Sequence, residues 1–377
     1  MSIVALKKCP DYDPEKTYQS VVESIELLGG ISSFIKKGEK VLLKPNLLSA
    51  KPVERAVTTH PAIIEAVIRI VKDAGALPFI GDSPGIGSAG QVAARSGIKG
   101  VADRYGIEIV NLSEGIRVEN SKGKVFKRFD ISKAAFEADA IINIPKLKTH
   151  AMMTMTLGVK NMFGCVPGKR KVSWHFEAGH DKKAFAKMLV ELYQLLSPRL
   201  TIIDGIIGME GDGPGSGIPR KMGLIAASAD AVAMDVIIGR MAGLDFDGLP
   251  TTEAAIELGI GETDPERIEV LGDAASMIFK DFLLPETVEP RFASWIPNFI
   301  KTHMEKALTS RPVVLYDLCK ECSICVNSCP PGAMKVTDKL RIDYEHCIRC
   351  YCCHELCPEG AIDIKKGWGM KLLGTTA

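Results

Sequence analysis

The chain has 377 residues, which is long enough for two or three domains. Charged residues make up 25% of it and the formal net charge is +1, so a chain-wide attraction to nucleic acid or another polyanion is excluded. The sequence contains no run of about 18 apolar residues and no apolar N-terminal signal segment, which predicts a cytoplasmic protein without a membrane span. Eleven cysteines in such a protein favour metal ligation over disulfides.

Residues 1–284 are predicted to form an α/β domain, with a mostly parallel sheet and flanking helices. Apolar segments that end in turn residues alternate there with amphipathic segments, as this architecture requires. The predicted strands cover residues 41–48, 77–82, 108–113, 140–147, 200–207 and 222–228. The predicted helices cover residues 61–74, 88–104, 183–196 and 230–242. Ligands of such sheets bind beyond the carboxyl ends of the strands, so polar residues in those loops are the functional candidates.

Two early loops carry candidates. Lys44 and Asn46 lie in the sequence KPN at the end of the first predicted strand. His60 precedes a predicted helix, where it either helps to bind an anion and transfer a proton or serves as a plain helix cap. Residues 81–90, GDSPGIGSAG, contain a formal G-x-G-x-x-G that is a dinucleotide-binding turn, a glycine-rich active-site loop or a plain turn.

A basic stretch forms the strongest candidate site of this domain. Residues 140–176 contain no Asp or Glu, and apolar side chains interleave with the basic ones, which indicates partial burial. The stretch predicts a cleft for an unidentified anionic ligand, while a solvated face or a docking patch for an acidic partner remains the alternative. The candidate ligand-binding residues are Lys146, Lys148, Lys160 and Asn161, and those for proton transfer or ligation are His150 and Cys165.

Two further segments allow more than one interpretation. Asp204, Glu210 and Asp212 lie in a glycine-rich loop that either approaches a ligand or cation or is a flexible surface loop. Residues 285–311 have apolar side chains at near-helical spacing. They predict a linker helix that packs a C-terminal domain onto the α/β domain, with a membrane-surface or partner helix as the alternative.

Eight cysteines near the C-terminus form two copies of C-x2-C-x2-C-x3-C-P. The first copy contains Cys319, Cys322, Cys325 and Cys329, and the second contains Cys347, Cys350, Cys353 and Cys357. Each cysteine of the second copy follows its counterpart by 28 residues, which indicates an internal duplication. Thiolates at this spacing are suited to iron–sulfur clusters, whereas zinc or disulfides would not need two interleaved triplets.

Residues 312–366 therefore resemble bacterial ferredoxins that carry two [4Fe–4S] clusters. The resemblance implies a small α+β ferredoxin-like domain, followed by a tail at residues 367–377. It also implies that the fourth cysteine of each copy ligates the cluster of the other copy. One cluster would then be held by Cys319, Cys322, Cys325 and Cys357, and the other by Cys347, Cys350, Cys353 and Cys329. Cys352 has no counterpart and is expected to be a bystander thiol.

The larger domain resembles the domain of unknown function 362 family, which is often fused to such a ferredoxin module. The segments that carry this resemblance are LLKPNLL, TTHP, GDSPG, IPKLKTH, GVKNMFGCVPGKRK and DGIIGMEGDGP. A looser resemblance to the N-terminal domain of nickel-dependent lactate racemases lacks the histidine pairs expected of that family.

Together these features predict an iron–sulfur oxidoreductase for an oxygen-poor setting. Single electrons would pass through two [4Fe–4S] clusters to or from a small anionic substrate in the basic cleft. The alternative is a non-catalytic electron carrier or subunit whose α/β domain docks a redox partner protein.

Overall fold

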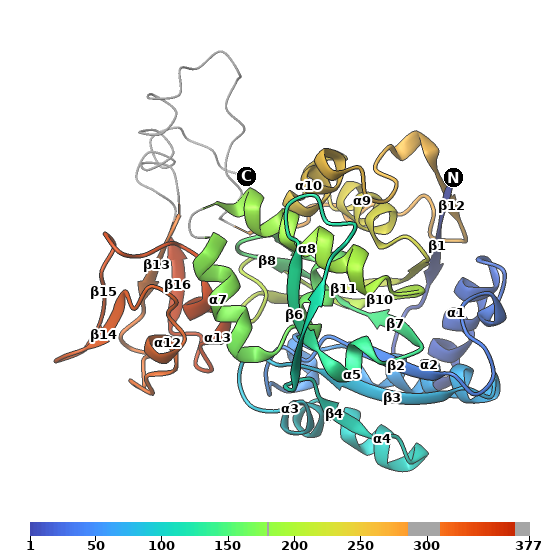
Figure 1. Ribbon diagram of the computed structural model, residues 1–377, viewed down its shortest axis with the longest axis horizontal. Coiled ribbons are helices and arrows are strands. Elements are labelled where there is room, and N and C mark those ends of the chain that lie inside the picture. Colours follow the sequence, from blue (N-terminus) through green and yellow to red (C-terminus); the bar gives the residue numbers. More distant parts are fainter. Residues whose placement is uncertain (179–180, 286–309, 366–377) are drawn as a thin grey trace.

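The computed structural model describes residues 1–178, 181–285 and 310–365. A ten-stranded sheet with helices on both faces forms the larger part, and a small domain of short strands and helices lies at one end (Figure 1). The prediction of a mostly parallel α/β sheet with flanking helices and a small C-terminal α+β domain is confirmed. The predicted linker helix at residues 285–311 lies outside the described residues except at its two ends, and the predicted tail at residues 367–377 lies wholly outside them.

The order of strands in the large sheet is β12-β1-β11-β10-β7-β2-β3-β4, with β8 pairing to β10 and β9 pairing to β8. The strands from β4 to β10 along this path run parallel, and β11 is antiparallel to both β10 and β1. The bounds are β1 Ser2–Lys8, β2 Lys40–Pro45, β3 Leu77–Asp82, β4 Ile109–Asn111, β7 Ala140–Ile144, β8 Lys146–His150, β9 Thr154–Thr156, β10 Leu200–Glu210, β11 Ile218–Ser228 and β12 Ile268–Leu271. A separate hairpin consists of β5 Gly115–Glu119 and β6 Arg128–Ser132.

Helices cover both faces of this sheet. One apolar core lies under α1 and α2, and two others lie under α8, α9 and α10. Each fully buried Leu, Ile or Phe contributes about 1.5–3 kcal/mol relative to exposure, so these cores hold the strand ends in fixed positions. The helix bounds are α1 Pro14–Glu26, α2 Pro61–Asp73, α3 Ala89–Arg95, α4 Ile98–Tyr105, α5 Lys133–Phe136, α6 Gly158–Asn161, α7 Gly168–Ala178, α8 Lys182–Leu196, α9 Ala231–Met241 and α10 Pro250–Leu258.

Two predicted elements are divided in the structure. The strand predicted at residues 140–147 is divided at Pro145 into β7 and β8, because proline has no N–H for the sheet ladder. The helix predicted at residues 88–104 is divided into α3 and α4 at Gly97, whose φ of +82° is left-handed. After the first division, β8, which carries Lys148 and His150, continues to pair with β10.

The small domain repeats one unit twice. Its elements are β13 Arg311–Val314, α12 Ile324–Asn327, β14 Met334–Val336, β15 Leu340–Ile342, α13 Cys352–Leu356 and β16 Ile362–Lys365. Strand β13 pairs with β16 and β14 with β15, both antiparallel. Left-handed backbone occurs at Ser323 before α12 and again at Tyr351 before α13, which are 28 residues apart. The two copies of the cysteine motif therefore share a local backbone conformation.

Helix α13 lies on the side of the small domain that faces the α/β domain (Figure 1). The His354 ring contacts two carbonyl oxygens, with Nδ1 2.7 Å from Ile362 O in its own domain and Nε2 3.1 Å from Asp212 O in the other. Leu356 packs so close to Gly85 that an added Cβ there would lie 2.5 Å from its Cδ2. These contacts hold α13 against the loop that follows β3 and against Asp212, which follows β10. Within the described ranges, no helix is both long and apolar enough to cross a membrane.

Candidate functional site

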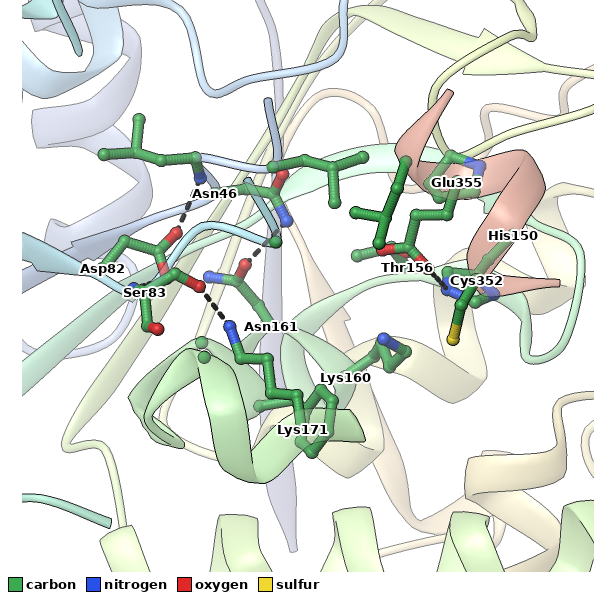
Figure 2. A pocket seen from close by; sticks show the side chains of 18 of the residues that line it. Asn46, Asp82, Ser83, His150, Thr156, Lys160, Asn161, Lys171, Cys352 and Glu355 are labelled. Atoms are coloured by element: carbon green, nitrogen blue, oxygen red, sulfur yellow. Dashed lines mark hydrogen bonds and ion pairs between the residues drawn. The ribbon is translucent and has the colours of Figure 1, made fainter. Parts of the chain in front are cut away.

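A cavity of about 100 Å³ lies where α13 meets the strand ends of the α/β domain. Its α/β walls come from the end of β2, the end of β3, strand β8 and the segment from α6 to α7, and its remaining wall comes from the small domain (Figure 2). Of the predicted site residues, the cavity is lined by Lys44, Asn46, Lys148, His150, Lys160 and Asn161. Residues about 100 positions apart in the sequence, such as Asn46 and Lys148, thus line the same cavity, as expected for the strand ends of a parallel sheet.

A chain of amides fixes one side of the cavity. Lys148 Nζ donates to Asn46 Oδ1 at 3.0 Å and to Val57 O at 2.6 Å. Asn46 Nδ2 donates to Asn161 Oδ1 at 2.9 Å, and Asn161 Nδ2 donates to Asn143 Oδ1 at 2.8 Å. Since each donor in this chain meets an acceptor, the side chains have single defined orientations.

A buried ion pair lies beside this chain. Lys44 Nζ is 3.1 Å from Asp82 Oδ1, and both side chains are almost fully excluded from solvent. Asp82 Oδ2 also accepts from the backbone N–H of Leu47 at 2.7 Å, which ties the end of β2 to the end of β3. A Cβ at Gly164 would lie 2.1 Å from Asp82 Oδ1, so only glycine lets the segment after α6 approach this pair. Lys171 of α7 donates to Ser83 O in the same loop.

His150 is oriented so that it offers a donor to the cavity. Its Nδ1 accepts from the backbone N–H groups of Met152 and Met153, at 3.0 and 3.2 Å. Burial lowers the pKa of His150 to about 4, so the ring is neutral near pH 7 and carries its hydrogen on Nε2. Nε2 lies 3.6 Å from Glu355 Oε2 of α13, which is too long for a hydrogen bond (Figure 2).

Three side chains that line the cavity have buried polar atoms without a hydrogen-bond partner. These atoms are His150 Nε2, Thr156 Oγ1 and His175 Nδ1. Lys160 Nζ lies 5.2 Å from the centre of the Phe163 ring, and no ion pair or hydrogen bond to it exists within the described parts of the chain. Because buried polar atoms are normally paired, four such groups around one cavity are the features expected of a ligand site.

The lysines of the cavity are set up for proton exchange near neutral pH. Burial lowers the pKa of Lys148 to about 7 and that of Lys171 to about 8. Burial also lowers the pKa of Lys160, an effect that the negative charge of Glu355 opposes. A bound anion would favour the charged form of each lysine. The cavity can therefore hold a negative charge and supply protons to it.

Lys146 and His60 lie in a separate network that does not line the cavity. Lys146 Nζ lies 2.8 Å from Asp204 Oδ2 and donates to Tyr12 Oη at 2.8 Å. His60 is the N-cap of α2, where its Nδ1 accepts from Ala62 N at 3.1 Å, and its ring stacks on Tyr12 with centroids 3.5 Å apart. These contacts satisfy both residues internally.

Cys165 and the three acids Asp204, Glu210 and Asp212 do not line the cavity, although Pro214 does. Cys165 is buried in apolar surroundings, and this burial raises the pKa of its thiol to about 12, so the thiol stays protonated. The prediction of a loop is wrong for Asp204 and Glu210, which lie on β10. Asp204 pairs with Lys146, whereas Glu210 pairs with Arg220 at 2.6 Å, so these acids do not converge. In the described part of the chain, no three His, Cys, Asp or Glu side chains gather to hold a single metal ion.

The cysteines of the small domain line two further cavities. One is lined by Cys319, Cys322, Cys325 and Cys357, and the other by Cys329, Cys347, Cys350 and Cys353, together with Cys352. All of these cysteines are free thiols in the structure. Each of these two groups of four cysteines, called a cage below, offers the type of ligand that a cubane iron–sulfur cluster takes, with one thiolate for each of its four irons.

Cys352 connects the second of these cages to the larger cavity, since it lines both. Ser328, the neighbour of Cys329 in the sequence, also lines the larger cavity. The cage of Cys329, Cys347, Cys350 and Cys353 thus shares a lining residue, Cys352, with the basic cavity.

Sequence reasoning missed the contribution of the small domain to this cavity. Glu355 of α13 lines this cavity together with His150, Lys160 and His175, and its Oε2 lies 3.6 Å from His150 Nε2. The signal was present in the duplication, because Cys352, His354 and Glu355 replace Ile324, Val326 and Asn327 of the first copy. A polar change confined to one copy marks the helix that meets the other domain.

The fold and the cysteine cages define a protein in which a ferredoxin-type 4Fe–4S domain is joined to an α/β domain. A 4Fe-4S binding domain matches residues 340–363, and this domain supports a role in iron–sulfur electron transfer. The family described as a domain of unknown function, DUF362, matches residues 41–240, and the chain belongs to this family.

One relative is the thylakoid-associated protein sll1697 of Synechocystis sp., which is 42% identical over 287 residues. That match covers 76% of this chain and 89% of the relative. Among solved structures, the lactate racemase apoprotein from Thermoanaerobacterium thermosaccharolyticum is similar, with 12% identity and a TM-score of 0.39. The similarity covers 60% of this chain and 54% of that one.

Proposed function

We propose that the protein is an iron–sulfur oxidoreductase that moves single electrons between two [4Fe–4S] clusters and an anionic ligand held in the basic cavity. The observation that carries this proposal is the position of the cavity. It is walled on one side by α13 of the cluster-binding domain and on the other by the strand ends of the α/β domain. A ligand in it would lie next to the second cysteine cage.

The two groups of cysteines support a ligand set for each cluster. Cys319, Cys322, Cys325 and Cys357 would hold one cluster, and Cys347, Cys350, Cys353 and Cys329 the other. Each set takes its fourth cysteine from the other copy of the motif, as in bacterial ferredoxins. When bound, such clusters accept and release one electron at a time.

Exposure of the cysteines supports an order of the two clusters along the electron path. Cys322 is exposed, whereas Cys350 and Cys353 are buried and line the same cage as Cys352, which also lines the basic cavity. The cluster at Cys322 is therefore the one that a redox partner protein reaches, and the cluster at Cys350 is the one that exchanges electrons with the ligand. An exposed cluster is open to oxygen, which agrees with a role in an oxygen-poor setting.

Within the cavity, the chain's own residues hold the anion and move protons. Lys148, Lys160, Asn46 and Asn161 would bind it, with His150 Nε2–H as a further donor. Lys148 and Lys171 have lowered pKa values of about 7 and 8, so either can supply a proton when the ligand gains an electron. Leu47, Phe163 and Leu356 contribute an apolar wall.

The alternative function, a non-catalytic electron carrier that docks a partner through its basic stretch, has less support. Lys146 and Lys148 are each only 1% exposed and Lys160 is 8% exposed. A salt-dependent docking surface needs charges that reach a partner's surface, and these lysines point into the interior.

Native mass spectrometry of the protein purified without oxygen tests the proposal. We expect the mass of two [4Fe–4S] clusters plus a small molecule, and we expect the Lys160→Met variant to retain the clusters but lose the small molecule. The exposed Lys99→Met variant is the control and should retain both. If the mass of the wild type is fully accounted for by the clusters, the electron carrier becomes the better conclusion.

Cell fractionation tests the location, for which we propose the cytoplasm. The relative from Synechocystis sp. is named as thylakoid-associated. Recovery of this protein with washed membranes would argue against a cytoplasmic location.

A further inference from the structure

The ligand class of the basic cavity can be narrowed from the groups that line it. This step rests on the proposed function, because it concerns the same cavity. Four observations bear on it: the volume of the cavity, its unpaired donors, its apolar wall and the carboxylate already inside it.

The volume sets the size of the ligand. The cavity measures about 100 Å³. An engineered cavity of about 150 Å³ holds benzene, so a ligand of roughly four or five non-hydrogen atoms fits here. Displacement of the Glu355 side chain would make room for about three more. A nucleotide is much too large for this space.

The unpaired groups set its charge and geometry. His150 Nε2–H, Thr156 Oγ1–H and Lys160 Nζ are donors, and none of them has a hydrogen-bond partner among the described residues. The two lone pairs on each oxygen of a carboxylate can accept from all three at once. Figure 2 shows His150, Thr156 and Lys160 around the same part of the cavity, next to Glu355.

Glu355 indicates which kind of anion the donors suit. Its carboxylate lies beside His150, with Oε2 3.6 Å from Nε2, and lines the same cavity as Lys160 and His175. The site thus already accommodates one carboxylate, although not at hydrogen-bond distance from His150. A carboxylate that is not covalently attached to α13 can approach His150 Nε2 more closely than the carboxylate of Glu355 does.

The rest of the wall is apolar. Leu47, Leu48, Phe163, Val172 and Leu356 line the cavity. Such a wall favours a ligand with a short hydrocarbon body and disfavours an inorganic oxyanion, which is hydrated on all sides.

We propose that the cavity binds a small organic carboxylate, of about four to eight non-hydrogen atoms, through His150, Thr156 and Lys160. The carboxylate takes the place of the Glu355 side chain, and the hydrocarbon body lies against Phe163 and Leu356. The reactive part of the ligand then faces Cys352 and the adjoining cysteine cage.

Isothermal titration of the anaerobic holoprotein with propanoate, phosphate and propylamine tests this assignment. We expect propanoate to bind more tightly than phosphate, and propylamine not to bind. Thr156→Val and Lys160→Met should each weaken propanoate binding about tenfold, the value of one lost hydrogen bond to a charged group. Lys99→Met, on the exposed surface of α4, should bind like the wild type.

Glu355→Ala provides the sharpest comparison, because it removes the competing carboxylate and opens space. We expect it to bind propanoate about tenfold more tightly than the wild type. If the iron content and thermal midpoint of Glu355→Ala equal those of the wild type, the small domain is still folded and still packed against the α/β domain. In the reduced protein, paramagnetic broadening of the propanoate proton resonances would place the bound ligand next to a cluster.

Three outcomes would overturn the assignment: phosphate that binds as tightly as propanoate, propanoate that binds neither the wild type nor the Glu355→Ala variant, and affinity unaffected by Thr156→Val and Lys160→Met. A different result would reject the proposed function. Propanoate binding without any electron exchange between the clusters and the native ligand would reject the function and leave the carboxylate site standing. A native ligand that exchanges electrons with the clusters but has no carboxylate would reject the carboxylate assignment and leave the proposed function standing.

Discussion

Replacement of Lys146 by methionine is expected to destabilise the protein strongly while leaving the cavity intact. Lys146 pairs with Asp204 at 2.8 Å, and the two side chains are 2% and 0% exposed. Methionine keeps the length and apolar stem of lysine but leaves the Asp204 carboxylate buried without its cation. Tyr12 Oη and His60 N still donate to that carboxylate, at 2.7 and 2.8 Å, and limit the damage.

The magnitude follows from the burial of the pair. Loss of one partner from a buried ion pair costs about 3–5 kcal/mol. For a domain of this size, a loss of about 4 kcal/mol lowers the thermal midpoint by roughly 5–10 °C. The double variant Lys146→Met/Asp204→Asn removes both charges and should be more stable than Lys146→Met alone, because no uncompensated buried charge remains.

Circular dichroism of the anaerobic holoproteins at one scan rate measures these midpoints. Lys99→Met breaks only an exposed pair with Asp103 and should shift the midpoint by less than about 2 °C. Propanoate binding should be unchanged in Lys146→Met, since Lys146 does not line the cavity. If Lys146→Met is as stable as Lys99→Met, or loses ligand binding at full stability, the division into two networks is refuted.

Three further predictions concern the iron–sulfur clusters, the contact between the two domains and the pH dependence of stability. Cys353→Ser should lose about four irons, because one cage loses a ligand, whereas Cys352→Ser should keep the full iron content. His354→Ala removes the contact with Asp212 O and should increase proteolytic cleavage between the domains without loss of iron. Burial raises the pKa of Asp235 to about 7, so its contribution to stability is complete below about pH 4 and is lost as the pH rises to about 7. Asp235→Asn should therefore flatten the fall in thermal midpoint between pH 5 and pH 7.5.

Each of these has an outcome that contradicts it. Equal iron loss in Cys352→Ser and Cys353→Ser would mean that Cys352 is a ligand. Unchanged proteolysis of His354→Ala would mean that other contacts alone seat the module. An identical pH dependence in Asp235→Asn and the wild type would mean that Asp235 is already ionised at pH 5. In that case the two backbone donors from Gly158 and Val159 outweigh the burial.

Much of the fold and part of the site could be predicted from sequence because their signals are local. The alternation of apolar strands and amphipathic helices predicts the α/β class, and β3 begins and ends at the predicted residues 77 and 82. The antiparallel strands β1 and β11 needed pairing information, since neither periodicity nor composition distinguishes a parallel partner from an antiparallel one. The basic stretch also carries a local signal, the absence of acids.

Tertiary contacts decide which lysines of the basic stretch line the cavity and which do not. Lys146 and Lys148 lie two positions apart on β8, yet one pairs with Asp204 and the other faces the cavity. Their sequence context is alike, so only the partners brought by β2 and β10 distinguish them. In the same way, burial rather than the surrounding motif decides that the Cys165 thiol stays protonated.

The sequence by itself determined the cysteine cages, because cluster ligands must recur at fixed spacing and the spacing is covalent. It also determined which strand ends carry the polar residues. Only the tertiary structure decided that α13 closes the cavity, since Glu355 and His150 lie 205 positions apart and meet through the docking of one domain on another. Contacts of that kind depend on the summed packing of many side chains, and no short segment of the sequence contains them.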